Sequence, residues 1–130
     1  MKVKRTERGW AGHFVCADRC LFRRNTLLEF GEVRIVVSTI GMMVDIHTKG
    51  YPNNITYDKI GLDRYFETMV FHAKRVAERW WDADVYKQVD FDSPWSIGKL
   101  DADDVANDMH EIVVDEITQK LENGIINNLT

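Results

Sequence analysis

The sequence predicts an α+β domain in which an antiparallel β-sheet precedes one long C-terminal α-helix that packs on it. Three patterns lead to this prediction: a β-branched run over 33–40, period-two alternation over 83–91, and helical spacing of apolar residues over 105–121. A chain of 130 residues, 45% of them hydrophobic, can bury one core but not two. We therefore expect a single domain over residues 1–130, mostly β over about 9–98 and helical over about 101–123.

The pattern of the N-terminal half predicts short strands separated by turns. Residues 10–16 form a plausible first strand, and Gly31 lies between two apolar runs, 26–30 and 33–40, that together predict a hairpin. Residues 50–54 are rich in turn-forming residues, so we expect a loop there. A short strand over 55–60 should follow it.

The segment 62–84 is ambiguous. Its apolar residues fall on a helical stripe, but 65–71 is rich in aromatic and β-branched residues, and 83–91 alternates cleanly. A hairpin that turns through 76–79 fits both halves. Periodicity alone leaves helix and hairpin open.

The last element is an amphipathic helix. Asp101 or Asp103 can cap its start and Gly124 can end it. Its apolar residues recur at helical spacing: Val105, Met109, Ile112, Val113, Ile117 and Leu121. This stripe should face the sheet.

Composition and charge exclude several classes of protein. Charged residues at 29% and aromatic residues at 11% argue against a disordered chain. No apolar run approaches membrane-spanning length and no leader is visible, so we expect no membrane span and a cytoplasmic protein. Residues 1–40 hold eight Lys/Arg against four Asp/Glu, whereas residues 81–130 hold three against twelve. With a pI of about 5.5, the chain does not look like a binder of nucleic acid polymers.

His13, Cys16 and Cys20 have a spacing that invites a zinc site. A fourth ligand would have to come from His72 or His110 through the fold. Paired Cys-x-x-Cys knuckles are absent, and the alternative is two ordinary thiols in a reducing compartment. We expect no bound metal and no cofactor.

An arginine-rich segment is the first candidate binding site. It holds three guanidinium groups and one amide within seven residues: Arg19, Arg23, Arg24 and Asn25. Guanidinium groups bind phosphate in a bidentate manner and stack on flat rings. The alternative is a solvated loop whose arginines pair with the acidic C-terminal half.

Aromatic and acidic residues further along the chain form a second candidate. Tyr65, Phe71 and Trp81 could stack on a nucleobase, and Asp82, Asp84 and Asn107 could accept hydrogen bonds from ribose hydroxyls. Such aromatic residues also occur in cores and interfaces. A separate acidic cluster lacks calcium-loop spacing and suits a helix start instead: Asp101, Asp103, Asp104 and Asp108. The sequence has no nucleophile elbow, phosphate loop or zinc-deaminase signature, which favours binding over catalysis.

Six strings carry a resemblance to a known family: residues 7–14 (ERGWAGHF), 18–28 (DRCLFRRNTLL), 36–41 (VVSTIG), 64–69 (RYFETM), 81–85 (WDADV) and 106–111 (ANDMHE). The chain resembles, over residues 5 to about 120, the phage and prophage anti-Thoeris proteins that sequester cyclic ADP-ribose isomers. The resemblance implies sheet-rich dimers or larger oligomers that hold an immune signal without cleaving it, in some members with cyclic oligonucleotides in additional pockets. That description favours the hairpin for 62–84.

Under this interpretation Arg23 and Arg24 would hold phosphates and Phe71 or Trp81 would stack on the base, while Asp82, Asp84 and Asn107 would bind hydroxyls. Two other functions remain open. One is a metal-dependent nucleotide hydrolase or phosphodiesterase that uses the aspartates with His13 or His110. The other is a phage inhibitor that binds a host protein through Trp80 and Trp81.

Overall fold

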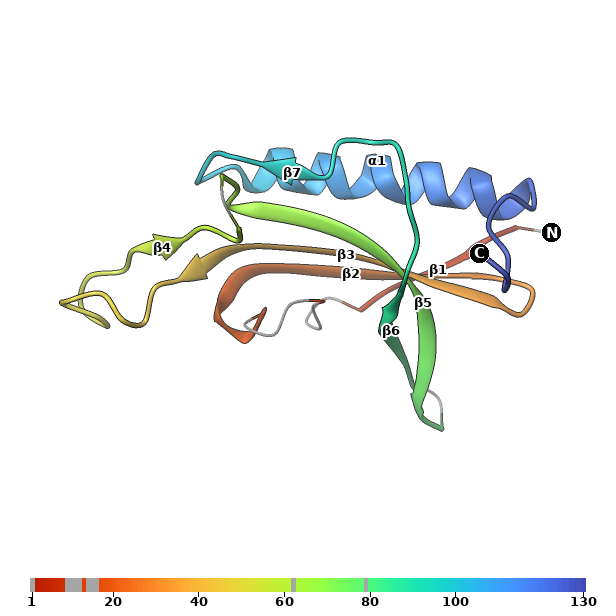
Figure 1. The fold of residues 1–130 in the computed structure, drawn as a ribbon, viewed down its shortest axis with the longest axis horizontal. Helices are drawn as coiled ribbons and strands as arrows, with labels where there is room; N and C mark the ends of the chain where they lie inside the picture. Colours follow the sequence, from red (N-terminus) through yellow and green to blue (C-terminus); the bar gives the residue numbers. More distant parts are fainter. Residues whose placement is uncertain (1, 9–12, 14–16, 62, 79) are drawn as a thin grey trace.

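The computed structural model describes residues 2–8, 13, 17–61, 63–78 and 80–130. The described residues form strands β1 (Lys4–Glu7), β2 (Cys20–Phe30), β3 (Val33–Val44), β4 (Tyr57–Asp58), β5 (Phe66–Ala77), β6 (Trp80–Gln88) and β7 (Ser96–Ile97), a short 3-10 helix η1 (Ala17–Arg19) and helix α1 (Asp103–Glu122). One antiparallel sheet runs in the order β1-β2-β3-β5-β6, with β4 paired to β3 and β7 paired to β5. Helix α1 lies along one face of this sheet (Figure 1). The α+β prediction is confirmed.

Strands β2 and β3 form the predicted hairpin at the centre of the sheet. Phe30 pairs with Val33, and Gly31 adopts a φ of 60° that suits the tight turn between them. Both strands are longer than the predicted runs 26–30 and 33–40, because polar residues such as Arg24 occupy strand positions near the sheet surface.

The ambiguous segment 62–84 is a hairpin. β5 continues to Ala77 and β6 begins at Trp80, which places the turn inside the predicted span 76–79. The helix alternative is wrong, because residues 66–77 pair as a strand with β3 and β6. β6 ends at Gln88, before the last residues of the alternating run 83–91.

Other boundaries differ from the predictions. The strand predicted over 55–60 is reduced to Tyr57–Asp58. The strand predicted over 10–16 lies, apart from His13, outside the described residues. Sequence patterns missed β1 and β7, because both are short, exposed segments at the margins of the sheet that lack alternating apolar residues.

The main core lies between α1 and the sheet. From the sheet, Leu28, Ile35, Val37 and Val70 are buried against the helix. The helix supplies four fully or almost fully buried side chains: Val113, Val114, Ile117 and Leu121. Burying one such side chain is worth roughly 1.5–3 kcal/mol, so this layer dominates the stability of the domain.

The prediction that the whole apolar stripe of α1 faces the sheet is partly wrong. Val105 and Ile112 are 56% and 52% exposed, because Ala106, Met109 and Val113 face the sheet and place these two residues at the side of the helix. The helix starts after Ala102 without a side-chain cap, so neither predicted aspartate caps it. Gly124 does end it, with a φ of 72° and its amide bonded to the Leu121 carbonyl. None of the described helices is both long and apolar enough to cross a membrane.

Gly41 lets two phenylalanine rings meet on the sheet. Its register partners on either side are Phe22 on β2 and Phe66 on β5. Their rings contact edge to face, with centroids 5.6 Å apart. A Cβ at Gly41 would overlap the Phe66 ring, so glycine is required by this close approach.

A chain of hydrogen bonds passes through fully buried His110 between α1 and the sheet. The His110 ring nitrogens lie 2.7 Å from the hydroxyls of Thr26 and Thr39, and the Thr39 and Thr68 hydroxyls lie 2.6 Å apart. The Thr26 hydroxyl donates to the Glu7 carboxylate, which can only accept. Burial lowers the pKa of His110 to about 4, so the ring is neutral at pH 7. Because Thr26 donates to Glu7, it accepts from the His110 Nε2–H, and His110 Nδ1 accepts from Thr39.

The chain between β6 and β7 leaves the sheet and is held to the helix by Glu116 and Lys120. Glu116 accepts the backbone N–H groups of Asp92 and Ser93, both at 2.8 Å, the Ser93 hydroxyl, and the Lys120 ammonium at 2.7 Å. Burial opposes ionisation of Glu116, but these donors hold its pKa at about 2. The carboxylate therefore anchors the loop 90–94 through most of the pH range.

Replacing Glu116 with glutamine should free this loop. The amide retains one acceptor oxygen and loses its charge, so we expect the free energy of unfolding to fall by about 1–2 kcal/mol in urea titrations. Hydrogen exchange at the Asp92 and Ser93 amides should accelerate. Glu122→Gln, which changes an exposed acid of the same helix, is the control. Unchanged exchange at both amides would contradict the anchoring role.

Candidate functional site

A cavity of about 470 Å³ lies between the start of β3, the β5–β6 hairpin and the C-terminal segment. We call it the Trp81 cavity. It is lined by Glu32, Arg34, His72, Ala73, Trp81, Lys87, Asn128 and Thr130. Its size falls within the range of about 300–1,000 Å³ typical of small-molecule sites. Trp81 is the one predicted site residue that lines it.

Arg34 and Trp81 form the centre of this cavity. The Arg34 guanidinium lies 4.2 Å from the Trp81 ring centroid, and its Nε donates to Glu29 at 3.1 Å. Stacking and ion pairing together fix the orientation of the guanidinium beside the ring. Because Arg34 covers one face of the ring, a flat ligand can stack only on the other face or at its edge.

Lys87, on β6, adds a second cation to the Trp81 cavity. The side chain is exposed, and the described residues offer it neither an ion pair nor a hydrogen bond. The lining holds two basic side chains, Arg34 and Lys87, and one acid, Glu32. Because Arg34 is paired with Glu29, Lys87 is the cation that an anion would meet unpaired among the described residues of the lining.

The C-terminal segment forms one wall of the Trp81 cavity. His72 Nε2 donates to the Thr130 carbonyl oxygen at 2.8 Å, which holds residues 127–130 beside β5. A carbonyl can only accept, so Nε2 carries a proton. The Asn128 amide lies in the same wall and can both donate and accept. The cavity thus combines a ring, two cations and an amide.

Arg24 and Asn107 do meet, but on the helix side of the sheet. Arg24 Nη1 donates to Asn107 Oδ1 at 3.4 Å, and its other nitrogens pair with Glu7 at 2.7 Å and Glu111 at 2.6 Å. Arg5 binds the same Glu111 carboxylate, and the Arg5 and Arg24 guanidinium groups lower the pKa of Glu111 to about 2. These partners match the alternative interpretation, in which arginines pair with the acidic C-terminal half.

Three further predicted residues lie on the opposite face of the sheet. Asn25 and Phe71 are buried, and the Asn25 Nδ2 atom has no hydrogen-bond partner among the described residues. Arg23 is half-buried at a register position beside Ile40, and no ion pair joins it to another described residue. None of the three lines the Trp81 cavity.

The remaining predicted residues lie at separate places in the fold. Arg19 lies 3.7 Å from Asp58, and Tyr65 packs beside Phe66 in a small core cluster. The Asp82 and Asp84 carboxylates accept nearby backbone N–H groups of their own strand, at 2.7 and 3.2 Å. Their roles as ligand contacts stay predictions, and the fold does not gather them at one point.

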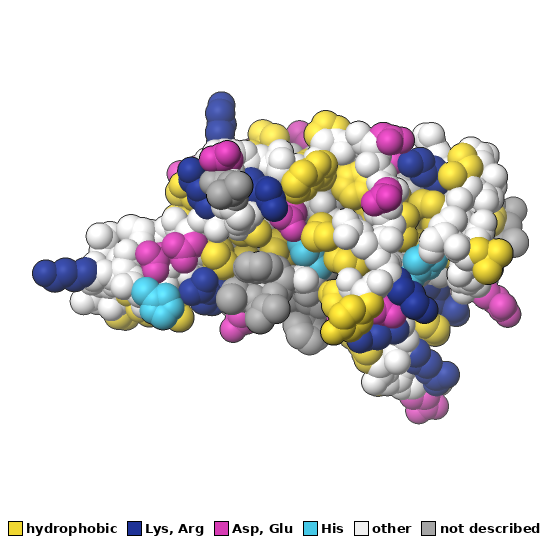
Figure 2. Space-filling view, viewed as in Figure 1, with side chains coloured by type: hydrophobic (Ala, Val, Ile, Leu, Met, Phe, Trp, Pro, Cys, Tyr) yellow, Lys and Arg dark blue, Asp and Glu magenta, His cyan; other side chains and the backbone are white. Residues whose placement is uncertain are grey.

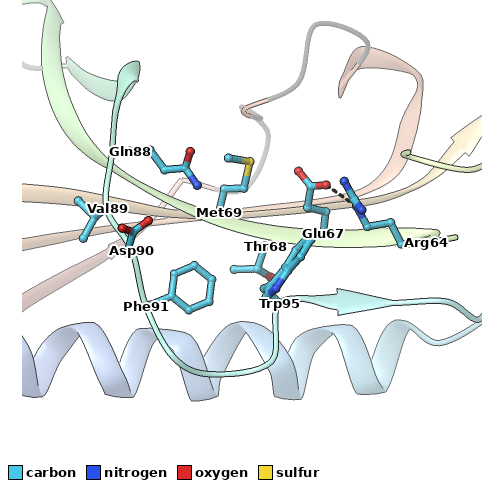
Figure 3. A pocket seen from close by; sticks show the side chains of 9 residues that line it. All are labelled: Arg64, Glu67, Thr68, Met69, Gln88, Val89, Asp90, Phe91 and Trp95. Carbon is cyan, nitrogen blue, oxygen red and sulfur yellow. Dashed lines mark hydrogen bonds and ion pairs between the residues drawn. The ribbon is translucent and has the colours of Figure 1, made fainter. Parts of the chain in front are cut away.

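A second pocket, of about 280 Å³, opens where the loop 90–94 departs from β5 (Figure 3). The Val89 amide donates to the Val70 carbonyl, and the Thr68 amide donates to the Trp95 carbonyl. Both ends of the loop 90–94 are therefore fixed to β5. Trp95 lies at one end of the pocket beside Arg64, whose guanidinium is 4.8 Å from the ring centroid.

A buried relay of hydrogen-bonded side chains, Arg64, Glu67, His13 and Ser38, extends from this pocket to the centre of the sheet. Arg64 Nε donates to Glu67 at 2.7 Å, the other Glu67 oxygen lies 3.0 Å from His13 Nε2, and His13 Nδ1 lies 2.9 Å from the Ser38 hydroxyl. Burial would raise the pKa of Glu67, but the bonds from His13 and Arg64 lower it. The order Ser-His-Glu matches a nucleophile, base and orienting acid, yet Ser38 is fully buried on the central strand. In this arrangement the relay positions Arg64.

The metal hypothesis involves the same histidine. Both ring nitrogens of His13 are engaged with Ser38 and Glu67, Cys20 is buried, and Cys16 lies outside the described residues. Within the described part of the chain no three His, Cys, Asp or Glu side chains are grouped so that they could hold a metal ion.

Comparisons with family models, with curated proteins and with solved structures return no match. The cavities must therefore be interpreted from their own chemistry.

Sequence reasoning missed Arg34, Lys87 and His72 as lining residues. Arg34 stands inside the β-branched run 33–40 and Lys87 inside the alternating run 83–91, where each serves as an outward strand residue. The lone cation within an apolar run was an available sign, since it marks a strand face that meets solvent or a ligand. Their convergence on Trp81 depends on the pairing of β5 with both neighbours.

Proposed function

We propose that this protein binds a small cyclic nucleotide in the Trp81 cavity and holds it without cleaving it. The observation that carries the proposal is the Arg34 guanidinium stacked on Trp81 in a cavity of about 470 Å³ that also contains Lys87. Phosphate groups would pair with the two cations, and a base would stack on the free part of the ring. Asn128 would bind a base edge or a ribose hydroxyl.

The resemblance to anti-Thoeris proteins supports a more specific version. A cyclic ADP-ribose isomer would be the ligand, and its sequestration would keep the effector of a bacterial immune system inactive. Such a protein works in the host cytosol and as a homo-oligomer. High affinity suits this role, because a sequestering protein must release its ligand slowly.

The test is thermal melting of the purified protein with cyclic ADP-ribose isomers, cyclic oligonucleotides and linear ADP-ribose. A ligand at 100 times its Kd adds about 2.7 kcal/mol, which raises Tm by roughly 10 °C. The complex is then heat-denatured and the released compound identified by mass spectrometry. Recovery of intact ligand supports sequestration.

Paired variants locate the site. Trp81→Ala should weaken binding about 10- to 100-fold through lost stacking, and Lys87→Ala about fivefold with a weaker dependence on salt. Trp80→Ala and Lys74→Ala are the matched controls, because these residues lie on the same hairpin outside the cavity. Equal affinity in all four variants would place the ligand elsewhere.

The same measurements separate the alternatives. Cleaved product that forms only with divalent metal would indicate the nucleotide hydrolase. No melting shift with any compound would contradict both nucleotide functions and favour an inhibitor that binds a host protein.

A further inference from the structure

A second surface of the molecule is an apolar groove between helix α1 and the segment that contains β7. It has a volume of about 210 Å³ and is lined by Pro94, Ser96, Ile97, Val105, Asp108, Met109 and Ile112. No residue is shared with the Trp81 cavity. Figure 2 shows hydrophobic and acidic side chains next to one another along the upper edge, where Figure 1 places α1 and β7.

The groove has the spacing of a helix-binding surface. Val105, Met109 and Ile112 stand at i, i+4 and i+7, so they form one stripe along two turns of α1. Val105 and Ile112 keep more than half of their surface exposed, although the sheet buries the other large apolar residues over 106–121. The pocket between this stripe and the β7 segment would accept apolar side chains of an amphipathic helix that lies along the groove.

The charge around the α1–β7 groove indicates which kind of partner would bind there. Between Asp101 and Glu122 the chain has eight acidic residues and one lysine. Glu111 and Glu116 are paired with Arg5, Arg24 and Lys120, and the other six acids have no ion pair with a described residue. Asp104 and Asp108 flank the stripe, and within the described residues neither has an ion pair or hydrogen bond. A negative rim attracts a basic segment and repels nucleic acids and anionic membranes.

A second copy of the chain fits this surface poorly. Its one described α-helix, α1, carries the same acidic face, so pairing of two such helices would oppose like charges. We infer that the α1–β7 groove docks a basic amphipathic helix of another protein, with apolar residues at i, i+3 or i+4 and i+7 and Lys or Arg beside them.

The test uses two synthetic helical peptides of about 18 residues, which form five turns. Both carry the same leucine stripe, and one has lysine where the other has glutamate. We expect the lysine peptide to bind at least about tenfold more tightly than the glutamate peptide, with affinity that falls as salt rises. Amide chemical shifts should move at 95–97 and 105–112.

Two sets of variants make the result specific. Val105→Lys with Ile112→Lys should abolish binding of the lysine peptide, and Asp104→Asn with Asp108→Asn should weaken it while leaving the apolar stripe intact. The control is Val76→Lys with Val85→Lys, which changes two valines of similar exposure, 51% and 47%, on the β5–β6 hairpin. Circular dichroism checks that each variant is folded.

Three outcomes would overturn the inference. The first is equal binding of both peptides, and the second is undiminished binding of the lysine peptide to the Val105/Ile112 variant. The third is a dimer of the unmodified protein that this variant converts to a monomer in sedimentation experiments, because a second copy would then be the occupant.

Discussion

Replacing His110 with alanine is expected to lower the free energy of unfolding by about 3–5 kcal/mol. The substitution leaves a cavity between α1 and the sheet, and it removes the partner of the Thr26 and Thr39 hydroxyls, which are fully buried. Urea unfolding at neutral pH, followed by tryptophan fluorescence, measures the loss. A cost below about 1 kcal/mol would show that the hydrogen-bond chain does not contribute to stability.

The same histidine should make the protein sensitive to acid. Burial, together with the positive charge of Arg24, lowers the pKa of His110 to about 4, compared with 6.5 in an unfolded chain. Between these values the unfolded state binds a proton that the folded state does not, so stability falls as the pH falls. The slope is about 1.4 kcal/mol per pH unit, or about 3 kcal/mol over the whole window.

His110→Gln separates titration from packing. A glutamine amide can donate to Thr26 and accept from Thr39 without gaining a proton, so its unfolding free energy should be nearly constant between pH 6.5 and pH 5. His47→Gln, on an exposed loop, should retain the slope of the original chain. If His110→Gln retained it as well, another group would be responsible. The carboxylates of Glu111 and Glu116, with pKa values of about 2, lose their stabilising contributions only below about pH 4.5.

Gly41→Ala is the second substitution with a large expected effect. The new methyl group would overlap the Phe66 ring, which is fully buried and closed in by Ala106 and Met109. We expect a loss of about 3 kcal/mol, at the upper end of the usual cost of overpacking. Thermal and urea unfolding would both report it.

A second substitution tests whether this clash is the cause. Phe66→Leu alone should cost about 1–2 kcal/mol by leaving a small void. In the double variant the alanine methyl group occupies part of that void, so the double variant should be at least about 1 kcal/mol more stable than the sum of the two single effects predicts. Additive costs would mean that Gly41→Ala acts through the backbone and not through the Phe66 ring.

Much of the fold could be predicted because local patterns determine it. The hairpin around Gly31 combines a turn residue with two apolar runs, and α1 has both a helical stripe and a glycine stop. The segment 62–84 could not be resolved by periodicity, because its apolar residues fit either a helix or a buried strand. Its pairing with β3 decided the outcome, and pairing is a long-range property.

The candidate site was less predictable for a physical reason. Arg24 and Asn107 were both selected, yet each finds its partners on the helix side, while Trp81 lies at the far edge of the sheet. Which side of a strand a residue faces is determined by register, and a shift of one residue reverses it. The sequence indicated suitable chemistry at Trp81 but could not place Arg34 over its ring.

The position of α1 at the end of the described fold affects how the chain can fold during synthesis. All strands leave the ribosome before the helix that covers Leu28, Ile35 and Val70. At about 5–20 residues per second, the 20 residues of α1 take roughly 1–4 s to make. During that time the sheet presents an apolar face with no cover, so nascent chains stalled before Ala106 should be bound by chaperones and those stalled well beyond Leu121 should be released.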